Sequence, residues 1–150
     1  MKGKVILLVE DNPDDEALTL RALRHNNIVN KVVVVRDGAE ALDFLFGTGA
    51  HKGRDIRDLP QVVFLDLKLP RIDGIEVLTR IRADHRTKLL PVVILTSSKE
   101  EQDLIAGYSN GANSYIRKPV DFNSFCDVMR QIETFWFGTV RLPAGTATGR

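Results

Sequence analysis

Five short apolar segments, separated by amphipathic stretches, are the feature that most limits what this chain can fold into. Most of them are rich in valine and isoleucine and apolar throughout; the last is weaker. They are Val5–Val9, Val32–Val35, Val62–Leu65, Val92–Leu95 and Tyr115–Ile116. Uninterrupted apolar segments of this length are typical of parallel strands that are covered on both faces. The sequence therefore predicts a buried parallel sheet.

The stretches between these segments carry residues that begin helices. Asn12 stands before a proline at the first helical position and before two aspartates in the first turn. Asp121 precedes the last helical stretch. Three further stretches have a cap residue with a glutamate three positions later, the capping-box spacing or a close relative of it. These pairs are Asp37 with Glu40, Asp73 with Glu76, and Ser98 with Glu101.

The alternation of strand and helix predicts an α/β fold in which a βα unit occurs five times. Right-handed crossovers leave few ways to wind such a chain. We expect the flavodoxin-like strand order 2-1-3-4-5, with helices on both faces and the functional site at the carboxyl ends of strands 1 and 3. Residues 47–60, with three glycines, are expected to form a long surface loop.

The charge balance and the single cysteine narrow the setting of the protein. Twenty-one basic and 20 acidic residues leave a net charge of +1, which gives no electrostatic reason to expect nucleic acid or a membrane as partner. Cys126 is the only cysteine, so no internal disulfide forms and the cytoplasm is the expected compartment. The five apolar residues before Glu10 are too few for a signal peptide or a membrane span.

Candidate functional side chains stand just past four of the five apolar segments. They are Glu10 and Asp11 after the first, Asp66 after the third, Thr96 after the fourth and Lys118 after the fifth. The carboxyl ends of parallel strands share one edge of the sheet, so these groups are expected to converge. Clustered carboxylates need a compensating cation, and an all-oxygen set without histidine or thiolate favours Mg²⁺ over Zn²⁺. The pattern predicts phosphoryl chemistry.

These residues stand in motifs that resemble a response-regulator receiver domain, the CheY-like family, from Lys4 to about Phe137. The motifs follow one another in the order of that family. They are Val9-Glu10-Asp11-Asn12, Asp66-Leu67-Lys68-Leu69-Pro70 with Asp73-Gly74, Leu95-Thr96-Ser97-Ser98, Gly111-Ala112, and Tyr115-Ile116-Arg117-Lys118-Pro119.

The resemblance implies a role for each residue that handles the phosphoryl group. Asp66 is the nucleophile that takes it from a phosphohistidine and forms an acyl phosphate. Lys118 holds the phosphoryl oxygens, and its bond to Pro119 is expected to be cis. Thr96 hydrogen-bonds one phosphoryl oxygen, and its movement makes room for the Tyr115 ring, so Thr96 and Tyr115 form the switch.

The resemblance also implies the metal ligands. Asp11 binds Mg²⁺ directly, Glu10 binds it through water, and Asp66 and the main-chain carbonyl of Lys68 complete the protein ligands. Most members of the family have aspartate where Glu10 stands. Glutamate is a common variant there, so the change bears only on the water-mediated contact.

Three consecutive aromatic residues, Phe135, Trp136 and Phe137, end the last helical stretch. Two interpretations stay open: they clamp the base of the domain itself, or they form a surface for a second copy or another partner. Residues 132–137, together with the long loop before the third strand, resemble the small stand-alone regulators paired with bacterial phytochromes.

We therefore expect a single receiver domain over residues 1–137 and a flexible tail over residues 138–150, which is too short for an output domain. Its output is then contact with other proteins. The resemblance implies a sensor histidine kinase as partner, with a phytochrome as one candidate. A histidine phosphotransfer protein and a homodimer are the other partners considered. The chain is not expected to be an enzyme beyond catalysing its own phosphorylation and dephosphorylation.

Two functions of other classes remain as alternatives. A phosphatase of the haloacid dehalogenase type also uses a strand-end aspartate and Mg²⁺, but its Asp-x-Asp motif is not matched, because Lys68 stands at the second position. A pseudo-receiver would bind partners without phosphorylation, and the complete set of pocket residues argues against it.

Overall fold

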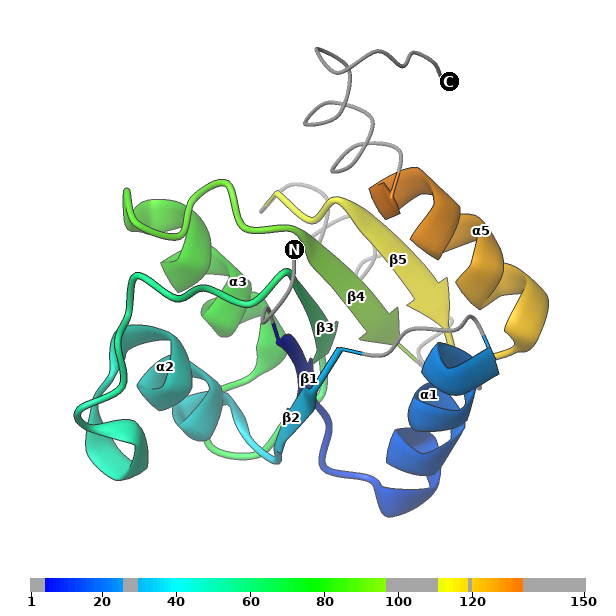
Figure 1. Cartoon of the computed structure of the whole chain (residues 1–150). Coiled ribbons are helices and arrows are strands. Elements are labelled where there is room, and N and C mark those ends of the chain that lie inside the picture. Colours follow the sequence, from blue (N-terminus) through cyan, green and yellow to red (C-terminus); the bar gives the residue numbers. More distant parts are fainter. Residues whose placement is uncertain (1–4, 26–29, 97–110, 119, 134–150) are drawn as a thin grey trace, which may run out of the picture.

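A computed structural model describes residues 5–25, 30–96, 111–118 and 120–133 (Figure 1). Five parallel strands form one sheet in the order β2-β1-β3-β4-β5, as predicted. Their bounds are β1 Ile6–Val9, β2 Val32–Val35, β3 Val62–Asp66, β4 Val92–Thr96 and β5 Ser114–Arg117. The third and fourth strands run one residue further than the apolar segments predict, because Asp66 pairs with Leu95 and Thr96 pairs with Arg117.

The helices begin where the capping residues predict. Their bounds are α1 Pro13–His25, α2 Gly38–Phe46, α3 Gly74–Ala83 and α5 Phe122–Glu133, with a 3₁₀ turn η1 over Gly49–His51. The carboxylates of Asp37 and Asp73 accept the main-chain N–H of Glu40 and Glu76 at 2.7 and 3.0 Å. The pair Ser98 and Glu101 lies outside the described residues.

Side chains from the two faces of the sheet pack into two separate apolar clusters. Leu7, Val9 and Leu65 point to the face covered by α2 and α3, and Leu8 and Phe64 point to the face covered by α1 and α5. Figure 1 shows the same arrangement, with α2 and α3 on one side of the strands and α1 and α5 on the other. Burial on both faces explains why the strands read as continuous apolar runs.

The segment expected to be a long surface loop is partly ordered against α2. The 3₁₀ turn brings the ring of His51 edge-on to Phe44, with 5.2 Å between ring centroids. Arg54 donates from Nη1 to the carbonyl of Asp58 at 2.9 Å, and its guanidinium lies over the same Phe44 ring. In the part of the chain that the structure describes, no helix combines the length and apolar composition needed to cross a membrane.

Candidate functional site

The sheet brings the predicted strand-end residues to one edge, and main-chain hydrogen bonds hold two of them beyond the ends of their strands. The N–H of Glu10 donates to the carbonyl of Val35 at 3.0 Å, and that of Lys118 donates to the carbonyl of Thr96 at 2.7 Å. Asp66 is itself the last residue of β3. The positions of these side chains are therefore set by the sheet ladder rather than by loops.

The ammonium of Lys118 is the centre of the site. It donates to Glu10 Oε2 at 3.1 Å, to Asp15 Oδ2 at 2.9 Å and to Asp66 Oδ2 at 3.0 Å. A lysine ammonium has three protons, so these contacts use all of its donors. Burial lowers the pKa of Lys118, but the three carboxylates outweigh that effect and raise the pKa above its usual value. Lys118 is therefore a fixed positive charge.

Glu10 is fully buried, which sets it apart from the other carboxylates of the site. Burial raises its pKa from 4.5 to about 7, and the hydrogen bond from Lys118 offsets this only in part. The nearby charge of Asp66 raises the same pKa further. Its Oε1 atom lies 2.9 Å from the Lys118 ammonium but accepts no hydrogen bond from the described residues.

Asp66 is 5% exposed and is held at both carboxylate oxygens. Oδ2 contacts Lys118, and Oδ1 accepts the main-chain N–H of Lys68 at 3.2 Å. The chain after Asp66 passes close to the start of α3, where the N–H of Gly74 donates to the carbonyl of Leu67 at 2.8 Å. The carboxylate therefore has a set direction and a protein donor on each oxygen.

The carboxylates of Glu10, Asp11 and Asp66 can each offer an oxygen such that the three oxygens lie within 4.8 Å of one another. Asp11 is exposed, which leaves the cluster open to solvent on one side. The buried Glu10 Oε1 atom accepts no hydrogen bond from the described residues, and it is the kind of oxygen ligand that a cation satisfies. The residues present thus fit a hard divalent ion. The contribution of the Lys68 carbonyl stays a prediction.

The two residues predicted to form the switch lie on neighbouring strands. Thr96 is buried at the end of β4, next to the site, and Tyr115 is 39% exposed on β5. Tyr115 pairs with Ile94 and Thr96 pairs with Arg117, so the two residues are offset by two positions in the register. The sheet brings them near each other, and their movement stays a prediction.

Asp15 is a site residue that the sequence analysis missed. It lies in the first turn of α1, where acidic residues are common because they favour the helix dipole, and nothing in the local pattern separates it from Asp14. Its contact with Lys118 joins residues more than a hundred positions apart in the chain. A helical position facing the sheet edge, rather than solvent, is the one signal that could have pointed to it.

Several predicted features lie outside the described residues. They are the cis bond at Pro119 and the aromatic residues Phe135, Trp136 and Phe137. The two interpretations of those aromatic residues therefore both stand as predictions.

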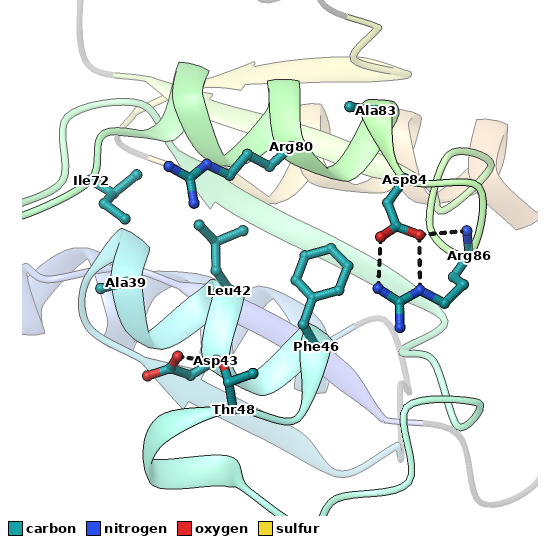
Figure 2. A pocket seen from close by; sticks show the side chains of 10 residues that line it. All are labelled: Ala39, Leu42, Asp43, Phe46, Thr48, Ile72, Arg80, Ala83, Asp84 and Arg86. Carbon is teal, nitrogen blue, oxygen red and sulfur yellow. Dashed lines mark hydrogen bonds and ion pairs between the residues drawn. The ribbon is translucent and has the colours of Figure 1, made fainter.

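A hollow lies between α2 and α3, on the face away from α1 and α5 (Figure 2). It measures about 490 Å³ and has an apolar side formed by Leu42, Phe46 and Ile72. At its end, Arg86 donates to both carboxylate oxygens of Asp84 and lies over the Phe46 ring at 5.3 Å. None of the strand-end residues lines it, so we place the functional site at the sheet edge.

Fold and site together define a class of protein: an open parallel α/β sheet with a buried carboxylate–lysine cluster at its carboxyl edge. The family model described as response regulator receiver domain matches residues 6–130, so the chain belongs to the response regulator receiver family of two-component signalling. This confirms the resemblance and the predicted fold.

Known relatives agree with this assignment over most of the chain. The probable methanogenesis regulatory protein FilR2 of Methanothrix harundinacea is 41% identical over 93% of this chain and 87% of its own length. Response regulator Rcp1 of Synechocystis is 39% identical over 94% of each. Among solved structures, the bacteriophytochrome response regulator RtBRR has a TM-score of 0.81 and 46% identity, covering 89% of this chain and 80% of that chain. The Mn²⁺-bound form of Rcp1 has a TM-score of 0.74 at 38% identity, covering 91% and 96%.

Proposed function

We propose that this protein is the phosphoacceptor of a two-component phosphorelay and that Asp66 receives the phosphoryl group. The observation that carries the proposal is the convergence on Asp66 of one ammonium and two further metal-ligating carboxylates at the sheet edge. A carboxylate held between Lys118 and the N–H of Lys68 is oriented as a nucleophile, and membership of the receiver family supplies the phosphoryl chemistry.

The reaction needs a cation beside the acceptor, and Mg²⁺ is the one we propose. Its proposed ligands are Glu10, Asp11, Asp66 and the main-chain carbonyl of Lys68. A bound Mg²⁺ would neutralise negative charge on the phosphoryl oxygens. The related Rcp1 is described in a Mn²⁺-bound form, which supports a divalent ion in this protein, and the all-oxygen ligand set favours Mg²⁺.

Each residue of the site then has a separate role in the transfer of the phosphoryl group. An Asp66 oxygen attacks phosphorus as the bond from phosphorus to the histidine nitrogen of the donor breaks, and the imidazole leaves with that electron pair. Lys118 gives the transferred phosphoryl group a charge-assisted hydrogen bond. Thr96 binds another phosphoryl oxygen, and its displacement starts the rearrangement that Tyr115 completes.

The donor that we propose is a sensor histidine kinase linked to a phytochrome. The support is the similarity to RtBRR and AtBRR, both of which are named bacteriophytochrome response regulators. FilR2 is about as identical to this chain as Rcp1, but its name points to the regulation of methanogenesis. The experiment must therefore test the identity of the kinase separately from phosphorylation of Asp66.

Incubation with acetyl phosphate and Mg²⁺, followed by intact mass measurement, tests the proposal. Wild type should gain one phosphoryl group, and Asp66→Asn should gain none, because the amide is a poor nucleophile. Equal labelling of the two proteins would overturn the assignment of Asp66. A second arm uses a phosphorylated phytochrome kinase as donor. Labelling by acetyl phosphate without labelling by that kinase would overturn only the proposed partner.

A further inference from the structure

Among the described residues, Asp15 is the one carboxylate that binds Lys118 without belonging to the group able to hold a metal ion. Glu10 and Asp66, the other two acceptors, are both in that group. The ammonium thus neutralises part of the negative charge that would attract a divalent cation. Any cation that enters must compete with Lys118 for two of its ligands.

The position of Asp15 is fixed by main-chain contacts on both sides. Its N–H donates to Asn12 Oδ1 at 3.0 Å, and its carbonyl accepts the hydroxyl of Thr19, which is fully buried, at 3.0 Å. The N–H of Asn12 in turn donates to Glu10 Oε2 at 3.2 Å. The first turn of α1 is therefore tied to the site, and the half-buried Asp15 carboxylate faces it from the helix side.

We propose that Asp15 is a positioning residue: it holds the Lys118 ammonium at the α1 side of the site, so that Glu10 and Asp66 can be given up to a divalent cation. The inference rests on the proposed function, since it concerns the loading of the same site. When the cation neutralises the carboxylates of Glu10 and Asp66, their attraction for the ammonium falls. Asp15 retains its charge and keeps Lys118 within reach of the acceptor.

Removing the Asp15 charge should let Lys118 collapse onto the metal ligands. In Asp15→Asn, we expect the dissociation constant for Mg²⁺ to rise about five-fold, a size typical of groups that share a partner. It is measured by titrating the amide resonances of Asp66 and Lys68. Asp14→Asn is the matched control, because Asp14 lies in the same first turn with the same charge but is exposed. That variant should change the dissociation constant about two-fold or less, as expected for a screened charge.

A double-mutant cycle separates positioning from a direct effect of charge. In a Lys118→Ala background there is no ammonium to hold, so Asp15→Asn should change the Mg²⁺ dissociation constant less than about two-fold. A five-fold change that persists without Lys118, or an equal effect of Asp14→Asn, would overturn the inference, because each shows Asp15 acting by charge alone.

The ammonium itself provides a spectroscopic readout. In wild type with Mg²⁺, the Lys118 Nζ proton–nitrogen correlation should remain visible, because a buried, hydrogen-bonded ammonium exchanges slowly. In Asp15→Asn with Mg²⁺ the correlation should broaden or disappear. A correlation that is unchanged in Asp15→Asn would overturn the inference. If that variant does not fold, Asp15→Ala, which has the highest helix propensity, takes its place.

Phosphorylation by acetyl phosphate, measured in parallel, keeps the two proposals apart. At limiting Mg²⁺ the rate should fall about five-fold in Asp15→Asn, and at saturating Mg²⁺ it should return to within about two-fold of wild type. If wild type is labelled while its Lys118 signal and Mg²⁺ affinity match those of Asp15→Asn, only the role of Asp15 fails. If wild type is not labelled at all, the proposed function fails.

Discussion

At the scale of single residues, Glu10 carries a conflict between its burial and its charge. The proposed metal site needs the carboxylate, but burial favours the protonated acid and raises its pKa to about 7 in the metal-free protein. Protonation of Glu10 and binding of a cation are therefore linked: each opposes the other.

The pH dependence of stability should show this conflict. The unfolded chain releases the Glu10 proton near pH 4.5, whereas the folded chain keeps it to about pH 7. The folded state therefore binds more protons between these values, so its free energy of unfolding falls as pH rises through that window. Urea denaturation of the metal-free protein at a series of pH values measures the slope.

Two glutamate-to-glutamine variants, one a test and one a matched control, check the assignment to Glu10. Glu10→Gln should lose this component of the slope, and Glu76→Gln, at an exposed position on α3, should keep it. Hydrogen bonds from Arg86 lower the pKa of Asp84, so that group titrates below the window and does not mask the effect. Identical slopes in wild type and Glu10→Gln would contradict the prediction.

At the scale of elements, the start of α3 determines how the chain leaves the proposed phosphoacceptor. A Cβ atom on Gly74 would lie 2.3 Å from the main-chain oxygen of Asp66 and 2.6 Å from Leu67 Cα. The helix and the strand end thus approach each other as closely as a backbone without side chain allows. The same feature occurs at α2, where a Cβ on Gly38 would lie 1.7 Å from the oxygen of Ile72.

Gly74→Ala should therefore damage both stability and the site. The methyl group forces the Asp66–Leu67 backbone to move, at a cost of about 1–3 kcal/mol. Gly53→Ala is the control: Gly53 has a φ of 96° and nothing within 4 Å of an added Cβ, so only backbone strain of about 1–2 kcal/mol applies. Labelling by acetyl phosphate should slow in Gly74→Ala and stay at the wild-type rate in Gly53→Ala. Unchanged labelling in Gly74→Ala would show that the loop tolerates the shift.

The elements also show which parts of the molecule can be predicted from sequence. The positions of the strands and the caps at Asp37 and Asp73 follow from local patterns, because buried parallel strands and capping boxes have distinct signatures. The strand order follows from the general rules for winding βα units. The extra strand residue at Asp66 depends on its pairing with β4. The role of Asp15 could not be predicted, since its contact with Lys118 depends on how α1 packs on the far end of the chain.

At the scale of the whole molecule, Arg82 connects α3 to the segments before β4 and β5. Its guanidinium donates to the carbonyls of Lys88, Leu90 and Gly111 and to the side chain of Asn113, at 2.7–3.0 Å. Burial lowers its pKa, yet a guanidinium stays charged. One side chain thereby ties together chain segments that are distant in sequence, at the edge of the sheet opposite the site.

Arg82→Lys should destabilise the protein although it leaves the positive charge unchanged. A lysine ammonium has three donors at one atom and cannot reach all four acceptors. The carbonyl groups that lose their donor should lower the free energy of unfolding by about 2–3 kcal/mol. Arg80→Lys is the same change on the same helix, where an exposed arginine contacts Glu76 at 2.9 Å, and it should cost about 0–1 kcal/mol. Urea denaturation midpoints compare the two, and equal midpoints would contradict the proposed connection.

The complete use of the Lys118 protons also has a kinetic consequence. An anionic donor that reaches the empty site meets an ammonium whose three protons are already taken, surrounded by carboxylates. If the proposed function holds, we expect a cation to bind first and the phosphoryl donor second, and we expect no transfer in the reverse order. The proposed site would then respond to a phosphoryl donor only when a cation is already bound.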